Sequence, residues 1–113
     1  MKYLKYFEEN KNFKKYLLIY HYNTNDEFSN DIKSVLLLKV KYVGKNNITT
    51  ERIYDYGENG SMVSYYSPDL RSIIKISFDN LNRIIYQNDN LDITIGKMKE
   101  IYLIGKKTQK YNL

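Results

Sequence analysis

Residues able to carry acid–base or metal chemistry are few and scattered in this chain. His21 is the only histidine among 113 residues, and cysteine is absent. A metal site needs several nitrogen, sulfur or carboxylate ligands at compatible spacing, and a lone histidine supplies only one of them. We therefore interpret His21 as an ordinary strand residue rather than a base, and the sequence predicts no metal site and no cofactor.

Two pairs of carboxylates, Asp55 with Glu58 and Asp89 with Asp92, fall at predicted turns. Acidic residues are common in turns because their side chains bond to the local backbone, whereas a catalytic carboxyl needs an apolar cleft that shifts its pKa. The chain also lacks a glycine-rich phosphate loop, a His-Glu-x-x-His motif and a Gly-x-Ser-x-Gly motif. These observations favour a protein that is not an enzyme, although a metal-free nuclease built from Tyr, Lys and His has no motif to find.

A basic, tyrosine-rich surface is the strongest candidate for a binding site. The chain has 13 tyrosines and a net charge of +5. Tyrosine rings stack on unpaired bases and lysines contact phosphates, while Tyr and Arg are also enriched at the hot spots of protein interfaces. The predicted binding residues are Tyr54, Tyr56, Tyr65, Arg52, Lys39 and Lys41. The alternative is that these tyrosines belong to the core, with their hydroxyls reaching water.

A predicted β-hairpin places these tyrosines on one face. Asn59-Gly60 is typical of a type I′ turn, because both central residues of that turn need a positive φ. With this turn, Tyr56 pairs with Val63 and Tyr54 pairs with Tyr65, and Arg52 lies further along the same face. Lys39 and Lys41 belong to the neighbouring strand.

That neighbouring strand, residues 35–43, is the longest apolar-dominated run in the chain and ends at Gly44. Its alternation gives one fully apolar face and one face that carries Lys39 and Lys41. The remaining predicted elements are a helix over residues 2–14, a strand over 15–22, a loop with one helical turn over 25–31, a strand over 48–56, and strands over 72–78, 83–87, 91–95 and 98–104.

Seven or eight short strands with little helix indicate a mainly β fold, a small antiparallel barrel or sandwich with an N-terminal helix. The alternative is an α+β fold in which the helix packs on one face of a sheet. The length predicts one globular domain over residues 1–105, followed by a frayed basic C-terminal tail over residues 106–113.

The composition is rich in residues with AT-rich codons. There are 13 Asn, 13 Ile and 15 Lys, but only 3 Arg and no Ala. This bias favours an AT-rich genome, such as that of a low-GC bacterium, its phage or a mobile element. Because no apolar run reaches 18 residues and the N-terminus lacks an apolar signal segment, we expect no membrane association and a cytoplasmic location, in the host cell if a phage encodes the chain.

Three functions fit these observations. The first is a small non-enzymatic interaction protein of a phage or mobile element that binds and occludes a host or defence protein, by its surface or by adding a strand at an open sheet edge. The second is a single-strand nucleic-acid-binding β barrel, whose affinity would fall steeply with salt. The third is a subunit of a homomeric or virion assembly.

Overall fold

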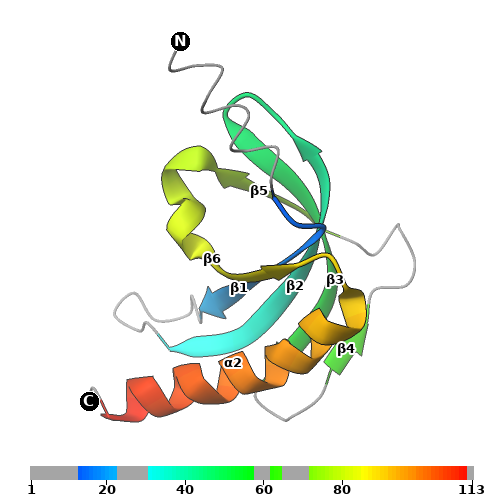
Figure 1. Ribbon diagram of the computed structural model, residues 1–113. Coiled ribbons are helices and arrows are strands. Elements are labelled where there is room, and N and C mark those ends of the chain that lie inside the picture. The colour runs from blue at the N-terminus through cyan, green and yellow to red at the C-terminus, as the bar shows by residue number, and fades with distance from the viewer. Residues whose placement is uncertain (1–12, 23–30, 58–61, 65–71, 112–113) are drawn as a thin grey trace.

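The computed structural model describes residues 13–22, 31–57, 62–64 and 72–111. Within these residues one antiparallel sheet of six strands carries a long C-terminal helix on one face (Figure 1). The strands are β1 (Tyr16–Tyr22), β2 (Ile32–Val43), β3 (Asn47–Gly57), β4 (Met62–Ser64), β5 (Ile73–Ser77) and β6 (Ile84–Asn88); a 3₁₀ segment η2 (Phe78–Arg83) and the helix α2 (Leu91–Tyr111) complete the fold. The prediction of a mainly β protein is confirmed.

The strand order is β4–β3–β2–β1–β6, and β5 also pairs with β3. β3 is long enough to take both short strands, since β5 pairs with its residues 47–51 and β4 with its residues 54–56. The sheet is not closed into a barrel, which corrects the predicted barrel or sandwich. The reason is that the last two predicted strands, which could have closed it, form α2 instead.

The sheet nevertheless curls strongly, and its two ends come round toward each other (Figure 1). β5 lies beyond β3 and β6 lies beyond β1, yet only the six residues of η2 connect them. So short a connection holds the two edge strands close together. The side chain of Ser77 starts η2 by accepting a hydrogen bond from the backbone N–H of Asp79 at 3.2 Å.

Two apolar clusters lie on opposite faces of the sheet. The first, under α2, contains Tyr16, Leu18, Ile32, Val35, Leu37, Ile53, Tyr56, Met98 and Tyr102. The second, inside the curl, contains Leu17, Ile19, Leu36, Leu38 and Ile76, with Ile74 and Ile84 packed against it. Because successive residues of a strand point to opposite faces, β1 and β2 supply side chains to both clusters.

The helix α2 corrects three predictions, namely the strands over 91–95 and 98–104 and the N-terminal position of the helix. Its buried residues follow a helical period, from Thr94 through Met98 and Tyr102 to Gly105. Asn90 caps its first turn, accepting a hydrogen bond from the N–H of Ile93 at 3.0 Å. α2 also continues to Tyr111, through most of the segment that we predicted to be a frayed tail.

A close approach between α2 and β1 occurs at Gly105. A Cβ atom at this position would lie 2.6 Å from Cδ1 of Ile32 and 2.8 Å from the hydroxyl of Tyr20. That hydroxyl donates a hydrogen bond to the carbonyl of Ile101 at 3.0 Å. The absence of a side chain at Gly105 therefore allows Tyr20 to lie against the backbone of the helix.

The predicted β3–β4 register is wrong by one residue. Tyr56 pairs with Met62 and Tyr54 with Ser64, so five residues separate the innermost pair. An odd number of connecting residues shifts every cross-strand partner by one relative to the predicted two-residue turn. Asn59-Gly60 itself lies outside the described residues.

The predicted helix over residues 2–14 falls almost wholly outside the described residues, as does the segment 25–31 apart from Asp31. Phe13 and Lys14, which the structure does describe, are not helical. No helix within the described part of the chain is long and apolar enough to cross a lipid bilayer.

Candidate functional site

The two described tyrosines of the predicted face pack against the first apolar cluster. Tyr56 is 9% exposed, and its ring meets the ring of Tyr102 of α2 edge-on, with centroids 5.4 Å apart. Tyr54 is half-buried and packs against the same cluster. These two rings therefore fill the space beneath α2 rather than offering flat faces to bases. Tyr65 lies outside the described residues.

Arg52 does not share the face of Tyr54 and Tyr56. The pairing of β2 with β3 contains a bulge. Leu37 lies opposite Tyr54 and the next residue, Leu38, lies opposite Arg52, so Ile53 of β3 has no partner of its own in β2. An extra residue breaks the two-residue alternation and turns the next side chain to the opposite face. The prediction that Arg52 lies along the tyrosine face is thus corrected, because the sequence pattern does not show this bulge.

Lys39 and Lys41 lie on β2 beyond the end of the tyrosine cluster. Lys39 is half-buried and pairs across the sheet with Glu51. The Nζ of Lys41 lies 3.4 Å from the Oε1 of Glu51, and this lysine is half-exposed. The carboxylate of Glu51 therefore offsets the positive charge of Lys41, one of the two lysines that we predicted to contact phosphate. The structure does not bring the described members of the predicted site together on one surface.

A different concave site lies inside the curl of the sheet. This hollow, which we name the arginine hollow, has a volume of about 440 Å³ and an apolar floor of Ile19, Leu36 and Ile74. The curl positions these three residues, because Ile19 and Leu36 come from the central strands β1 and β2 and Ile74 comes from the edge strand β5. The wall residues are His21, Arg52, Ser72 and Arg83, together with Tyr20 and Tyr22.

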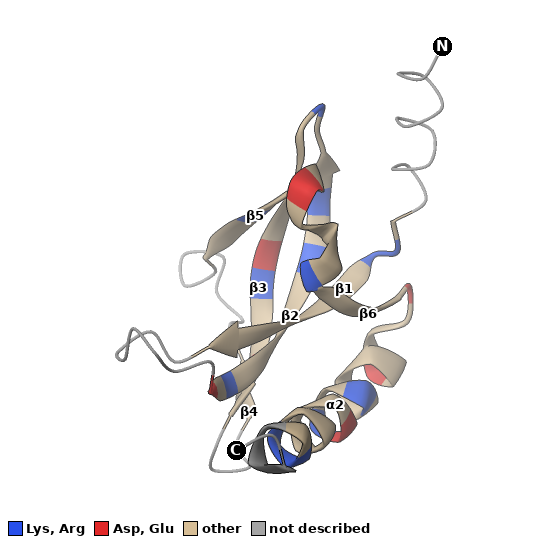
Figure 2. Cartoon of the chain, turned by 90° about the vertical axis from the view of Figure 1, so that its left-hand side faces the viewer, with Lys and Arg blue, Asp and Glu red and all other residues tan. Residues whose placement is uncertain are grey.

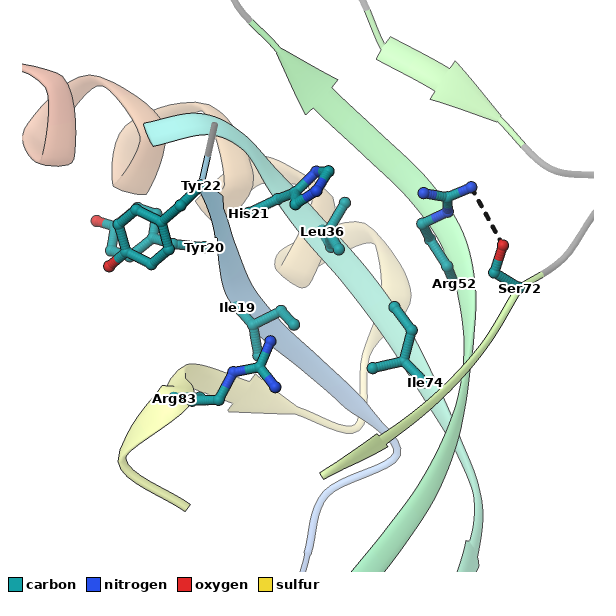
Figure 3. A pocket seen from close by; sticks show the side chains of 9 residues that line it. All are labelled: Ile19, Tyr20, His21, Tyr22, Leu36, Arg52, Ser72, Ile74 and Arg83. Atoms are coloured by element: carbon teal, nitrogen blue, oxygen red, sulfur yellow. Dashed lines mark hydrogen bonds between the residues drawn. The ribbon is translucent and has the colours of Figure 1, made fainter. Parts of the chain in front are cut away.

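Two arginines approach the hollow from different elements. Figure 3 shows Arg52 of β3 on one side and Arg83 of η2 on the other, with the three apolar side chains between them. Nη2 of Arg52 donates a hydrogen bond to Oγ of Ser72 at 3.3 Å, and the backbone N–H of Arg52 donates to the carbonyl of Ser72 at 2.9 Å. These two bonds fix the chain just before β5 against β3.

His21 faces the hollow from β1 and is half-buried (Figure 3). Burial lowers the pKa of His21, because desolvation disfavours the charged imidazolium. Asp55 raises the pKa, and the positive charges of Lys33, Arg52 and Arg83 each lower it. Oγ of Ser34 lies 3.5 Å from Nδ1 of the ring. The lowered pKa favours the neutral imidazole at neutral pH. Three positively charged side chains and one carboxylate act on this ring.

This arrangement can bind an anion, and it lacks the parts of a metal centre. Within the described residues there is no group of three or more His, Cys, Asp or Glu side chains that could hold a metal ion. Two guanidinium groups, a hydroxyl and an imidazole supply several hydrogen-bond donors for oxygen acceptors.

The sequence pattern does not indicate the arginine hollow. The only local signal was that Ile19 and His21 share a face of β1. Arg83 is 31 residues from Arg52 along the chain, and only the connection through η2 brings it over the central strands. No spacing rule predicts that approach.

A second surface feature lies on the outer face of α2. Ile93, Leu103 and Ile104 are 50%, 55% and 54% exposed. Leu103 and Ile104 are neighbours near the C-terminal end of the described part of α2. Ile93 lies on the same side of the helix as Ile104 but eleven positions away, about 16 Å along the axis, with Lys97 and Glu100 between them. Lysines occur along α2, and Figure 2 shows them as blue segments with red acidic segments among them. Nζ of Lys97 forms an ion pair with Glu100 at 3.1 Å on the same helix.

Comparisons with protein-family models, with curated proteins and with solved structures found no match for the chain.

Proposed function

We propose that this chain is a small non-enzymatic interaction protein, which binds another protein through the outer face of α2 and blocks it. The observation that carries this proposal is the exposure of Ile93, Leu103 and Ile104 on a helix whose opposite face is already packed on the sheet. Exposed apolar residues grouped on one surface are characteristic of protein contact sites. A helix that offers exposed apolar side chains among charged ones fits a partner groove with an apolar floor and a polar rim.

The partner we propose has an acidic rim around its apolar groove. α2 carries Lys97, Lys99, Lys106 and Lys107 in its described part, against Asp92 and Glu100. Opposite charge at the rim speeds association and selects against basic partners. In keeping with the AT-rich codon bias, we place this partner in the bacterial host of a phage or mobile element, as a host or defence protein.

The test is capture of a protein from cells of the native host by three immobilised forms of the chain. The double variant Leu103→Glu/Ile104→Glu places two charges on the proposed contact surface. The matched control Tyr42→Glu makes the same kind of change at a residue that is 66% exposed and belongs to β2. We expect one protein to be retained by the wild type and by Tyr42→Glu and lost by the double variant, since an interface carboxylate loses hydration without a partner.

Retention of the same proteins by all three forms, or of none by the wild type, would count against the proposal. Circular dichroism shows whether each variant is folded. Mass in solution separates this proposal from the homomeric alternative, because a chain that binds itself through α2 would be an oligomer that the double variant converts to a monomer.

The single-strand nucleic-acid alternative stays a prediction, and no specific observation favours it. Its stacking platform required exposed Tyr54 and Tyr56, whereas Tyr56 packs against Tyr102 in the core. Fluorescence anisotropy with labelled single-stranded DNA at two salt concentrations tests it directly.

A further inference from the structure

We propose that the arginine hollow is a binding site for a small organic anion, with an apolar body on the floor of Ile19, Leu36 and Ile74 and a phosphate or carboxylate group held between Arg52 and Arg83. This site is separate from the outer face of α2, because its residues come from β1, β2, β3, β5 and η2. Neither proposal requires the other.

The size and floor of the hollow suit a small molecule. A volume of about 440 Å³ lies within the range of roughly 300–1,000 Å³ in which small ligands bind. Ile19 and Leu36 are 1% and 4% exposed and belong to the second apolar cluster, against which Ile74 packs, so the floor is held by close packing. Ile19 and Leu36 have little surface in contact with water, so an apolar ring or chain of the ligand would cover mainly the half-buried side chain of Ile74.

The walls determine the charge of the ligand. Arg52 and Arg83 reach the hollow from opposite sides (Figure 3), and a guanidinium presents parallel N–H donors that match two oxygens of one phosphate or carboxylate. The hydroxyl of Ser72 adds a further donor or acceptor on the side of Arg52. Among the residues that the structure describes, no carboxylate forms an ion pair with Arg83.

The surroundings of His21 support a net positive site. Lys33 of β2, Arg52 of β3 and Arg83 of η2 act on the ring from three elements, and Asp55 of β3 opposes them. Ser34 of β2 is the hydroxyl nearest to Nδ1. An oxyanion bound between the arginines would offset their charge at His21, and so would raise the pKa of His21.

The single histidine makes this testable by NMR, because the imidazole of His21 gives the only histidine signals of the chain. The probes are inorganic phosphate, phenyl phosphate and benzoate, each added to the full-length protein at constant ionic strength. We expect a saturable shift of the His21 signals with phenyl phosphate or benzoate, and weaker binding of inorganic phosphate because it has no apolar body. Which of the two aromatic anions binds more tightly identifies the acidic group.

Two variants each remove one positive charge, one inside the hollow and one outside it. Arg83→Gln removes a cation from the wall of the hollow at an exposed residue whose loss should leave the fold intact. Lys75→Gln, on the exposed side of β5, is the matched control. We expect Arg83→Gln to weaken binding of the preferred aromatic anion about tenfold, as for loss of one charge-assisted hydrogen bond, and Lys75→Gln to change it by less than about twofold.

Three outcomes would overturn the proposal. They are the absence of a saturable shift with either aromatic anion, an equal loss of affinity in both variants, and equal binding of inorganic phosphate and the preferred aromatic anion. The second would show only a general effect of net charge, and the third would show that the apolar floor takes no part.

Discussion

At the scale of single residues, His21 shows how burial and neighbouring charges change the properties of a side chain. On the sequence it was a lone histidine without a partner. In the fold it faces a hollow, half-buried, with Lys33, Arg52 and Arg83 acting on it and Asp55 opposing them. Desolvation is the largest cause of its lowered pKa, so the neutral form is favoured in the folded state relative to the unfolded chain.

This pKa makes the stability of the protein depend on pH near neutrality. The folded pKa lies below the ordinary value of about 6.5, so the unfolded chain takes up the proton first as pH falls. The contribution of His21 is therefore complete above about pH 6.5 and is lost as pH falls from there through the lower folded pKa. We expect urea unfolding at pH values between about 7 and 5 to show a loss of stability that is smaller in His21→Gln.

Asp55→Asn provides the control for that experiment. Removal of the carboxylate that raises the pKa of His21 should lower this pKa further, whereas Arg83→Gln should raise it. NMR titration of the single histidine measures both shifts. If the two variants shift the pKa of His21 in the same direction, the assignment of these charges is incorrect.

At the scale of elements, α2 shows why a local alternation can mislead. Leu91-Asp92-Ile93-Thr94-Ile95 alternates like a strand, and Gly96 resembles a turn. The longer period of Thr94, Met98 and Tyr102 is helical, and burial of that face against the sheet decides the conformation. Gly96 lies within the helix and faces solvent, and no atom lies within 4 Å of a Cβ built there.

The two glycines of α2 should respond in opposite ways to alanine. Gly96→Ala places a methyl group in open space and should increase the free energy of unfolding by about 0.5–1 kcal/mol, the ordinary helix preference for alanine. Gly105→Ala drives its Cβ into Ile32 and Tyr20 and should decrease the free energy of unfolding by about 1–3 kcal/mol, as overpacking does. Denaturant unfolding compares the two variants with the wild type.

A third variant identifies the cause. Ile32→Val removes Cδ1, the atom 2.6 Å from the Cβ built at Gly105. In the double variant Ile32→Val/Gly105→Ala we expect a smaller loss than the sum of the two single losses, because neighbouring sites that relieve one another are non-additive. Simple additivity would locate the effect of Gly105→Ala elsewhere.

At the scale of the whole molecule, two apolar clusters depend on the same central strands. Leu17 and Leu18 are adjacent in β1 and fully buried, yet they belong to opposite clusters. Neither cluster can lose its packing without disturbing the strands that carry the other. The described part of the chain should therefore unfold as one cooperative unit.

Core substitutions in the two apolar clusters test whether they unfold cooperatively. Met98→Ala in the first cluster should lower the free energy of unfolding by about 2–5 kcal/mol, and Ile76→Val in the second by about 0.5–1.5 kcal/mol. Ile73→Val, the same change at a residue that is 57% exposed on the same strand, should change it by less than about 0.5 kcal/mol. Far-ultraviolet circular dichroism and tyrosine fluorescence should give coincident transitions; separate transitions would mean that the clusters unfold independently.

Local alternation and turn residues determined much of the fold from the sequence by itself. They predicted the strands near residues 15–22, 35–43, 48–56, 72–78 and 83–87, because a strand that is buried on one or both faces leaves a pattern in its own residues. They also predicted that the strand over 35–43 ends at Gly44 and neighbours the strand over 48–56, and β2 does pair with β3.

Tertiary structure alone decided the helical state of residues 91–111, the bulge at Ile53 that separates Arg52 from Tyr54, and the approach of Arg83 to Arg52 and His21. Each depends on contacts between segments far apart in the chain. The packing of α2 on the sheet outweighed the local alternation, and the curl of the sheet formed the arginine hollow. Long-range packing selects among conformations whose free energies the local sequence leaves nearly equal. The spacing of residue types therefore does not predict which conformation forms.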